Sequence, residues 1–334
     1  MTLTHRERLQ ACITDDTALD RPPVALWRHF PVDDQDPETL AAAALDFQRR
    51  YDFDLVKVTP ASSFSIKDWG AEDVWEGHTE GTRRYTKRVI EDPHDLERLP
   101  ALSPSSPHLA RQLACLRYIR TELSPETPLL QTVFSPLAQA KNLAGGERLV
   151  VHLRRHPEAV LKGLETIAET TRRFIEACMN IGIDGVFYAV QHAQAGLLTF
   201  DEYKTFGLPN DLTSLKPAKS LWCNLLHLHG LNVHFELITQ SLFPDHLFQI
   251  VNWHDRETGP SLAEGLKNDL GAVCGGINQK TIVFGNRSEV QKEAADAIAQ
   301  TSGRRFILGT GCVVPVIAPH GNILASRQIV DGAE

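Results

Sequence analysis

The chain has 334 residues, 42% of them hydrophobic and 23% charged, a composition typical of a globular protein with a sizeable core. Its net charge of −8 argues against nucleic acid or an anionic membrane as the main partner. The chain has no apolar run of transmembrane length, no signal-peptide core at its start and no CxxC pair among its six cysteines, so we expect a cytoplasmic protein with reduced thiols.

Short apolar runs rich in β-branched residues recur along the chain and predict β-strands. In chain order they are 24–27, 55–58, 129–134, 186–190, 224–229, 247–253, 272–277 and 305–310. Segments with helical periodicity lie between them, among them 37–51, 156–182 and 287–302. The second of these segments has Pro157 near its first turn and Gly182 at its end, as a helix should.

This alternation of strands and helices predicts parallel pairing, and eight such units predict a (β/α)8 TIM barrel preceded by an N-terminal extension. An open doubly wound sheet is the alternative, but no GxGxxG turn follows the first strand. The long gap after the second strand, roughly 60–128, is an insertion, and 73–92 within it predicts a hairpin at the barrel mouth. We interpret residues 1–334 as a single domain.

Polar side chains follow the predicted strands, where a barrel builds its active site. The first strand ends in Trp27 and Arg28, and the fourth in Gln191 and His192. Arg28 is the only cation at the end of its strand, so we expect it to face the barrel mouth and bind an anionic substrate group. A salt bridge at the mouth is the alternative. We place Trp27 and Gln191 beside Arg28 as substrate-binding residues.

Three of these residues are candidates for acid–base catalysis. His192 can transfer a proton, although a structural, hydrogen-bonded imidazole is an equal alternative. The sixth strand runs into His254 and Asp255. We predict that His254 is catalytic and that Asp255 orients it or a metal-bound histidine, unless Asp255 is simply solvated.

The segment LWCNLLHLHGLNVHF (221–235) places His227 and His229 two positions apart on a predicted strand, so both rings share one face. Cys312 follows the eighth strand, at the same end of the barrel. Two neutral imidazoles and a thiolate are three zinc ligands that leave a fourth position open. His254 and Glu236 are candidates for the fourth ligand, or for groups that support the ligands. We expect His234 to be unrelated, and a single buried histidine is more often a structural group.

Together these segments resemble the uroporphyrinogen decarboxylase superfamily over nearly the whole chain. The resemblance rests on the order and spacing of RPPVALWRHF, YDFDLVKVTPASSFSIKDWGAE, VFYAVQHAQAGLLTFDEYKTFGLP, LLHLHG, VCGGINQKTIVFGNRSEV and FILGTGCVVPVIAPHGNILASRQIV. It implies a barrel enzyme with one of two chemistries. One is the cofactor-free removal of carboxyl groups from uroporphyrinogen, and the other is zinc-dependent methyl transfer between corrinoid proteins and thiols.

The decarboxylase pattern is incomplete in this chain. Arg28 matches the first arginine of the family's substrate loop, but the loop continues HFPVDDQD, which would repel a polycarboxylate. Thr59 and Thr310 stand near the positions of the expected aspartate and histidine. The methyltransferase pattern, His-x-Cys on the fifth strand and Gly-Cys after the eighth, is matched by His227 and Cys312.

In that pattern His229 replaces a cysteine, which raises the net charge of the site and makes the metal a stronger Lewis acid. The resemblance therefore favours a zinc enzyme that transfers a methyl group between a corrinoid on a partner protein and a thiol or other small molecule. Decarboxylation of uroporphyrinogen or of a smaller acid is one alternative. A non-catalytic protein that binds a corrinoid or another tetrapyrrole is the other. The sequence leaves the oligomeric state open, a homodimer included.

Overall fold

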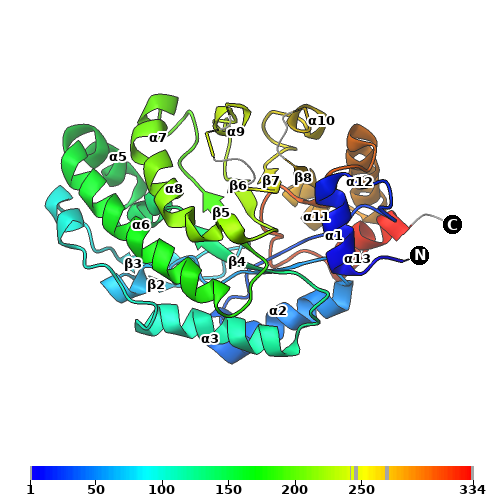
Figure 1. The fold of residues 1–334 in the computed structure, drawn as a ribbon, viewed down its shortest axis with the longest axis horizontal. Helices are drawn as coiled ribbons and strands as arrows, with labels where there is room; N and C mark the ends of the chain where they lie inside the picture. Colours follow the sequence, from blue (N-terminus) through cyan, green and yellow to red (C-terminus); the bar gives the residue numbers. More distant parts are fainter. Residues whose placement is uncertain (1, 241, 244–246, 268–270, 332–334) are drawn as a thin grey trace.

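A computed structural model describes residues 2–240, 242–243, 247–267 and 271–331 of the chain. Its main feature is a curled sheet of seven parallel strands surrounded by helices (Figure 1), with the strand order β1-β4-β5-β6-β7-β8-β9. These strands are β1 (Val56–Val58), β4 (Leu129–Phe134), β5 (Gly185–Val190), β6 (Leu225–Leu228), β7 (Ile250–Trp253), β8 (Ala272–Ile277) and β9 (Phe306–Thr310). Every residue of β4, β5 and β8 is buried, as expected of parallel strands covered on both faces.

The helices begin where local side chains can cap them. The Asp36 carboxylate accepts hydrogen bonds from the first backbone N–H groups of α2, and Asn286 forms a capping box with Glu289 in α12. The α-helices are α1 (His5–Thr14), α2 (Pro37–Tyr51), α3 (Pro107–Glu122), α4 (Pro136–Ala144), α5 (Gly146–Arg155), α6 (Pro157–Met179), α7 (Phe200–Phe206), α8 (Leu208–Leu215), α9 (Glu236–Thr239), α10 (Leu262–Gly265), α11 (Gln279–Phe284), α12 (Arg287–Thr301) and α13 (His320–Gln328). Short 3-10 helices are η1 (Asp33–Gln35), η2 (Lys67–Trp69), η3 (Pro93–Arg98), η4 (Pro217–Ser220) and η5 (Ile329–Asp331). None of the described helices is long and apolar enough to cross a membrane.

The first predicted strand, 24–27, is the main difference from a complete eight-stranded barrel. It forms one β-bridge, between Val24 and Leu308 of β9, and the Ala25 N–H donates to the Leu308 carbonyl at 2.9 Å. Val24 also accepts from the Asp54 N–H just before β1, at 2.8 Å. The segment therefore lies between β9 and β1 without becoming a regular strand. Pro22 and Pro23 precede it, and a proline has no N–H to donate to a ladder.

The predicted hairpin after β1 is confirmed as an antiparallel pair of β2 (Glu72–Val74) and β3 (Arg84–Lys87). Its connection passes close to the end of the 24–29 segment, because a Cβ atom on Gly81 would lie 2.4 Å from the Cβ of His29. Gly81 also has a φ of +77°, a left-handed conformation that favours glycine. The hairpin thus extends over the carboxyl end of the sheet.

A network of ion pairs occupies the opposite, amino end of the sheet. Asp54 is completely buried before β1 and accepts hydrogen bonds from Arg8 at 2.6 Å, Arg21 at 2.8 Å and the Val24 N–H at 2.7 Å. His5, whose Nδ1 lies 2.9 Å from Asp54 Oδ1, Arg21 and the Val24 N–H hold the pKa of the Asp54 carboxyl well below its usual range despite burial. The network ties the N-terminal segment to the sheet, and the pairing of Arg21 with Asp331 at 3.4 Å brings the two ends of the chain to the same side (Figure 1).

Candidate metal centre and substrate cavity

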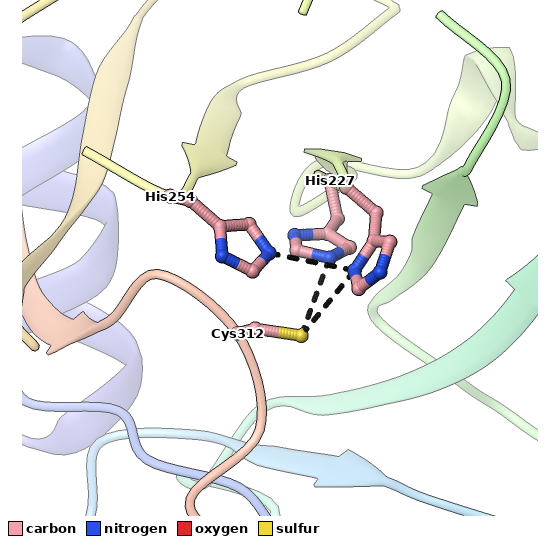
Figure 2. Close-up of side chains that lie close together, drawn as sticks. His227, His254 and Cys312 are labelled. Atoms are coloured by element: carbon pink, nitrogen blue, oxygen red, sulfur yellow. Dashed lines mark hydrogen bonds between the residues drawn. The ribbon is translucent and has the colours of Figure 1, made fainter. Parts of the chain in front are cut away.

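Three histidines and one cysteine meet at the carboxyl end of the sheet. His227 is on β6, His229 directly follows that strand, His254 follows β7 and Cys312 follows β9. One ligand atom from each of the four lies within 4.8 Å of all the others. Figure 2 shows the rings of His227 and His254 and the sulfur of Cys312 pointing toward one another. The expected convergence of His227, His229 and Cys312 is therefore present, and His254 joins it.

Three of the distances between these donors match those around a tetrahedral metal ion. Cys312 Sγ lies 3.7 Å from His227 Nε2 and 3.6 Å from His229 Nδ1, and His229 Nδ1 lies 3.4 Å from His254 Nε2. Around one zinc ion with ordinary bond lengths, tetrahedral donors lie about 3.3 Å apart for two nitrogens and about 3.6 Å apart for nitrogen and sulfur. The donor set, nitrogen and sulfur without carboxylate, is also one that zinc accepts.

Two glycines allow the backbone to bring these side chains together. Gly230, with a φ of +100°, turns the chain directly after His229, and a Cβ there would lie 2.2 Å from the Gln194 side chain. A Cβ on Gly311 would lie 2.7 Å from the Cα of His254 and 2.8 Å from the Trp253 carbonyl oxygen. The end of β9 can therefore approach the end of β7 only because residue 311 has no side chain. This close approach places Cys312 beside His254.

Asn252, on β7, fixes the orientation of the His227 ring. Its amide nitrogen donates to the carbonyls of Cys274 at 2.9 Å and Thr310 at 3.0 Å, so its oxygen must be the atom that lies 2.6 Å from His227 Nδ1. His227 Nδ1 is therefore the protonated nitrogen, and the lone pair on Nε2 faces the cluster. Such a partner for the second ring nitrogen is usual for a metal-bound histidine.

Burial keeps these groups uncharged. Burial, with a smaller effect of the neighbouring imidazoles, lowers the pKa of His227 well below the ordinary value and that of His229 to about 3. Burial also raises the pKa of the Cys312 thiol to about 12. Neutral imidazoles can donate a lone pair to a metal. The positive charge of a bound ion would stabilise the thiolate, so the thiol would give up its proton on binding the metal.

A cavity of about 90 Å³ adjoins the cluster. Trp27 and Gln191, predicted as substrate-binding residues, both line it. Lys57 of β1 also lines it and is only 8% exposed, and burial lowers the pKa of its ammonium group to about 7. The complete lining is Trp27, His29, Lys57, Thr59, Ser62, Glu80, Thr82, Thr132, Phe134, Phe187, Ala189, Gln191, His227, His229, Cys312 and Val313.

Arg28 lies outside this cavity, contrary to the expected orientation toward the barrel mouth. Its guanidinium stacks 5.2 Å from the ring centre of Phe30 and 5.6 Å from that of Phe47, on α2. The reason is the alternation of an extended chain, in which neighbouring side chains point to opposite faces. Trp27 and His29 face the cavity, so Arg28 faces α2.

The remaining predicted residues lie around the cluster. His192 is buried beside the cavity lining, and its pKa is lowered to about 3 by burial and by Lys141. Asp255 accepts the Gly276 N–H at 3.1 Å, which ties the His254 loop to β8, and burial raises its pKa to about 6. Glu236 lies in α9 outside the four-donor group. His234 is also outside it, and its Nε2 contacts the Leu198 carbonyl oxygen at 2.8 Å.

Sequence reasoning missed Lys57 and Asn252. For Lys57 a clue was available, because it is a single charged residue inside the apolar run DLVKVTP, which predicts a buried strand. Asn252 likewise interrupts the apolar run LFQIVNW. A polar residue in such a run has to find a partner inside the sheet, but the run itself does not reveal which partner.

The fold and this site define an α/β protein whose candidate site is made of polar side chains at the carboxyl ends of parallel strands. The chain belongs to the uroporphyrinogen decarboxylase family, whose model (URO-D) matches residues 24–332. The family and the solved neighbours are enzymes. A search of curated proteins finds no match to the chain.

Solved structures share the fold at low sequence identity. A methyltransferase from Methanosarcina mazei is 18% identical, with a TM-score of 0.83 and 99% of both chains covered. A B12-independent methionine synthase from Shewanella sp. W3-18-1, in complex with selenomethionine, is 13% identical with a TM-score of 0.54, covering 92% of this chain and 93% of its own. A putative vitamin-B12 independent methionine synthase from Listeria monocytogenes is 10% identical with a TM-score of 0.52, covering 90% and 85%.

Proposed function

We propose that this chain is a zinc-dependent methyltransferase that moves a methyl group from a corrinoid, carried by a partner protein, to a small thiol. The observation that carries the proposal is the group of four nitrogen and sulfur donors beside a small cavity. Further support for methyl transfer to a thiol comes from the names of the solved neighbours, a methyltransferase, a B12-independent methionine synthase and a putative vitamin-B12 independent methionine synthase. The corrinoid donor rests instead on the match of His227 and Cys312 to the pattern of the zinc-dependent methyltransferases.

In the proposed enzyme three of the four donors, His227, His229 and Cys312, hold the metal. The fourth position is left for the thiol, and His254 Nε2 stays free of the metal. Zinc would supply positive charge that lowers the pKa of a thiol and so favours the nucleophilic thiolate. His254 accepts the thiol proton at Nε2, and Glu257, whose Oε2 lies 3.1 Å from His254 Nδ1, compensates the charge of the imidazolium. Asp255 positions the loop that carries His254.

The methyl transfer balances without a further reactant. The lone pair of the thiolate sulfur forms the new S–C bond. The Co–C bond of the methylcorrinoid breaks and leaves both electrons on cobalt. The thiol proton leaves through His254 to solvent. The cavity of about 90 Å³ accepts a small thiol but is too small for a tetrapyrrole, so the corrinoid approaches from the mouth.

The proposal is tested with the purified protein under anaerobic conditions. Metal content is measured by elemental analysis, and free methylcobalamin is mixed with 3-mercaptopropionate, 2-mercaptoethanol or homocysteine. We expect about one zinc per chain, methyl thioether by mass spectrometry and the absorbance of reduced cobalamin, all lost after chelation and restored by zinc. Protein without stoichiometric metal, or metal-loaded protein that methylates none of these thiols, would refute the proposal.

A second assay separates this function from decarboxylation. The cavity has little room for a tetrapyrrole, and Arg28, which matches the family's substrate loop, lies outside it. We therefore expect no conversion of uroporphyrinogen to coproporphyrinogen. Conversion at an enzymatic rate would contradict the proposed function directly.

A further inference from the structure

Lys57 is a buried cation that the proposed metal centre does not use. Its ammonium group has one hydrogen bond, to Thr59 Oγ1 at 3.2 Å, and no carboxylate among the described residues pairs with it. It lies 4.4 Å from the ring centre of Phe187 and 5.9 Å from that of Trp27. The aromatic faces stabilise the positive charge only in part, because an ammonium group has three donors and is strongly hydrated in water.

Trp27 provides a second donor without a partner at the same place. Its indole Nε1 is buried and has no hydrogen-bond partner, although a buried indole N–H usually finds one. Trp27 and Phe187 pack edge to face with their ring centres 5.1 Å apart, so both rings and Lys57 form one wall of the cavity. Two buried donors at one wall, one without an acceptor and the other an amine that a bound anion would hold in its protonated form, suit an anion.

This wall is connected to the metal centre through Phe187. The Phe187 ring stacks on His227, with ring centres 5.2 Å apart, and also carries the Lys57 ammonium over its face. A ligand in the cavity can therefore reach Lys57 with one end and the four-donor group with the other. Since the cavity holds only about 90 Å³, these two ends must be a few atoms apart.

We infer that Lys57 and Trp27 bind the carboxylate of the substrate, so that the thiol of the proposed reaction belongs to a short mercapto acid. The inference rests on the proposed function for the identity of the thiol. The anion site itself depends only on the cavity wall. A carboxylate there takes one charge-assisted hydrogen bond from Lys57 Nζ and one hydrogen bond from Trp27 Nε1, which satisfies both unpaired donors.

The anion site is tested first without metal or turnover. Propionate and 1-propanol are titrated calorimetrically into chelator-treated wild-type protein and into Lys57→Met. We expect propionate to bind the wild type with measurable heat, and Lys57→Met to bind it about tenfold to a hundredfold more weakly. Equal binding of propionate to both proteins would overturn the site. The control is Lys87→Met, which removes an exposed lysine of β3 and should bind like the wild type.

The substrate is tested by comparing 3-mercaptopropionate with its neutral counterpart 3-mercapto-1-propanol in the methyl-transfer assay. We expect the wild type to prefer the carboxylate by tenfold or more in kcat/KM, chiefly through KM, and Lys57→Met to lose this preference. A carboxylate bound by the metal instead would keep the preference in Lys57→Met and overturn the inference. An equal loss toward both thiols would indicate a structural role and also overturn it.

A second variant covers the case in which Lys57→Met does not fold. Trp27→Phe keeps the aromatic contact and removes only the N–H, so it should weaken propionate binding severalfold with little effect on 1-propanol. Unchanged propionate binding would contradict the site. Propionate binding that depends on Lys57, without any methyl transfer, would support the site and refute the proposed function. Methyl transfer without a preference for the carboxylate would support the proposed function and refute the site.

Discussion

The two ends of the sheet both bury polar side chains, but they treat charge in opposite ways. At the amino end, Asp54 is paired with two arginines, and its charge is fully compensated. At the carboxyl end, Lys57, His227, His229 and Cys312 are buried and form no ion pair with a carboxylate of the described residues, and burial shifts the pKa of each toward its neutral form. The first arrangement stabilises the fold, and the second leaves donors free for a ligand. The residues that stabilise the fold thus lie at the amino end of the strands, and those of the candidate site lie at the carboxyl end.

The largest effect is expected from Asp54→Asn. This change removes the carboxylate charge that Arg8, whose side chain is 3% exposed, and Arg21 share, and leaves Arg8 with Asp20 alone. Breaking a buried pair costs about 3–5 kcal/mol. Urea denaturation should show this loss in the free energy of unfolding. Asp46→Asn is the matched control, because its pair with Arg50 is exposed and such pairs contribute about 0–1 kcal/mol. Similar losses of unfolding free energy in the two variants would mean that the buried pair contributes no more than the exposed one.

The Asp54 network also predicts the direction of acid sensitivity. The pKa of Asp54 is lowered in the folded state, so its stabilising contribution is complete above its unfolded pKa of about 3.9 and is lost as the pH falls below that value. The difference in stability between wild type and Asp54→Asn should therefore narrow when unfolding is measured below about pH 4. A difference that stays constant would mean that the carboxylate charge is not the cause.

At the other end of the sheet, His227→Ala and His229→Ala should each lose most of the bound zinc and the activity. Each change removes a metal donor, while the core that maintains the fold lies elsewhere. Elemental analysis after dialysis measures the metal, and urea denaturation of chelated protein measures the fold. The matched control is His234→Ala, which should keep its zinc because His234 contacts the Leu198 carbonyl instead. Full metal content in either site variant would argue against these ligands.

Asn252→Leu should have an intermediate effect. It removes the acceptor for His227 Nδ1, and losing such a partner typically weakens metal binding by about 10–100-fold. Competition with a chromogenic chelator gives the zinc affinity. Since Asn252 also donates to two carbonyls, a parallel denaturation curve separates lost metal affinity from lost stability. Unchanged zinc affinity would show that the orientation of His227 does not depend on Asn252.

The smallest effect is expected from Arg28→Met. The guanidinium stacks on Phe30 and Phe47, and the methionine keeps part of that packing, so the stability should fall by about 1 kcal/mol. Propionate binding should not change, because Arg28 does not line the cavity. Weaker propionate binding in this variant would indicate that Arg28, and not Lys57, binds the anion.

Much of the fold could be predicted because parallel strands leave a clear pattern in the sequence. The runs at 129–134 and 272–277 became β4 and β8 with the predicted bounds, and 37–51 became α2. The first strand could not be predicted in full. Its apolar run looks like the others, but it forms a single bridge, at Val24.

The candidate site was predictable only where sequence spacing fixes direction. His227 and His229 share a face because they are two positions apart, and Cys312 follows a strand at the same end of the sheet. The same rule, applied to Trp27, Arg28 and His29, would have turned Arg28 outward. His254 was one of two candidates for the fourth position, with Glu236. Its place beside the other three side chains depends on the contact between the ends of β7 and β9 at Gly311, which no local pattern encodes.

The short segment before Arg28 has a further consequence for the behaviour of the protein in solution. Residues 24–25 hydrogen-bond to β9 on one side and to Asp54, just before β1, on the other. Without this segment, β1 and β9 would present open edges, whose free N–H and C=O groups can pair with another chain. The segment with this single β-bridge, held by the buried Asp54, thus covers both edges and protects the protein against edge-to-edge aggregation.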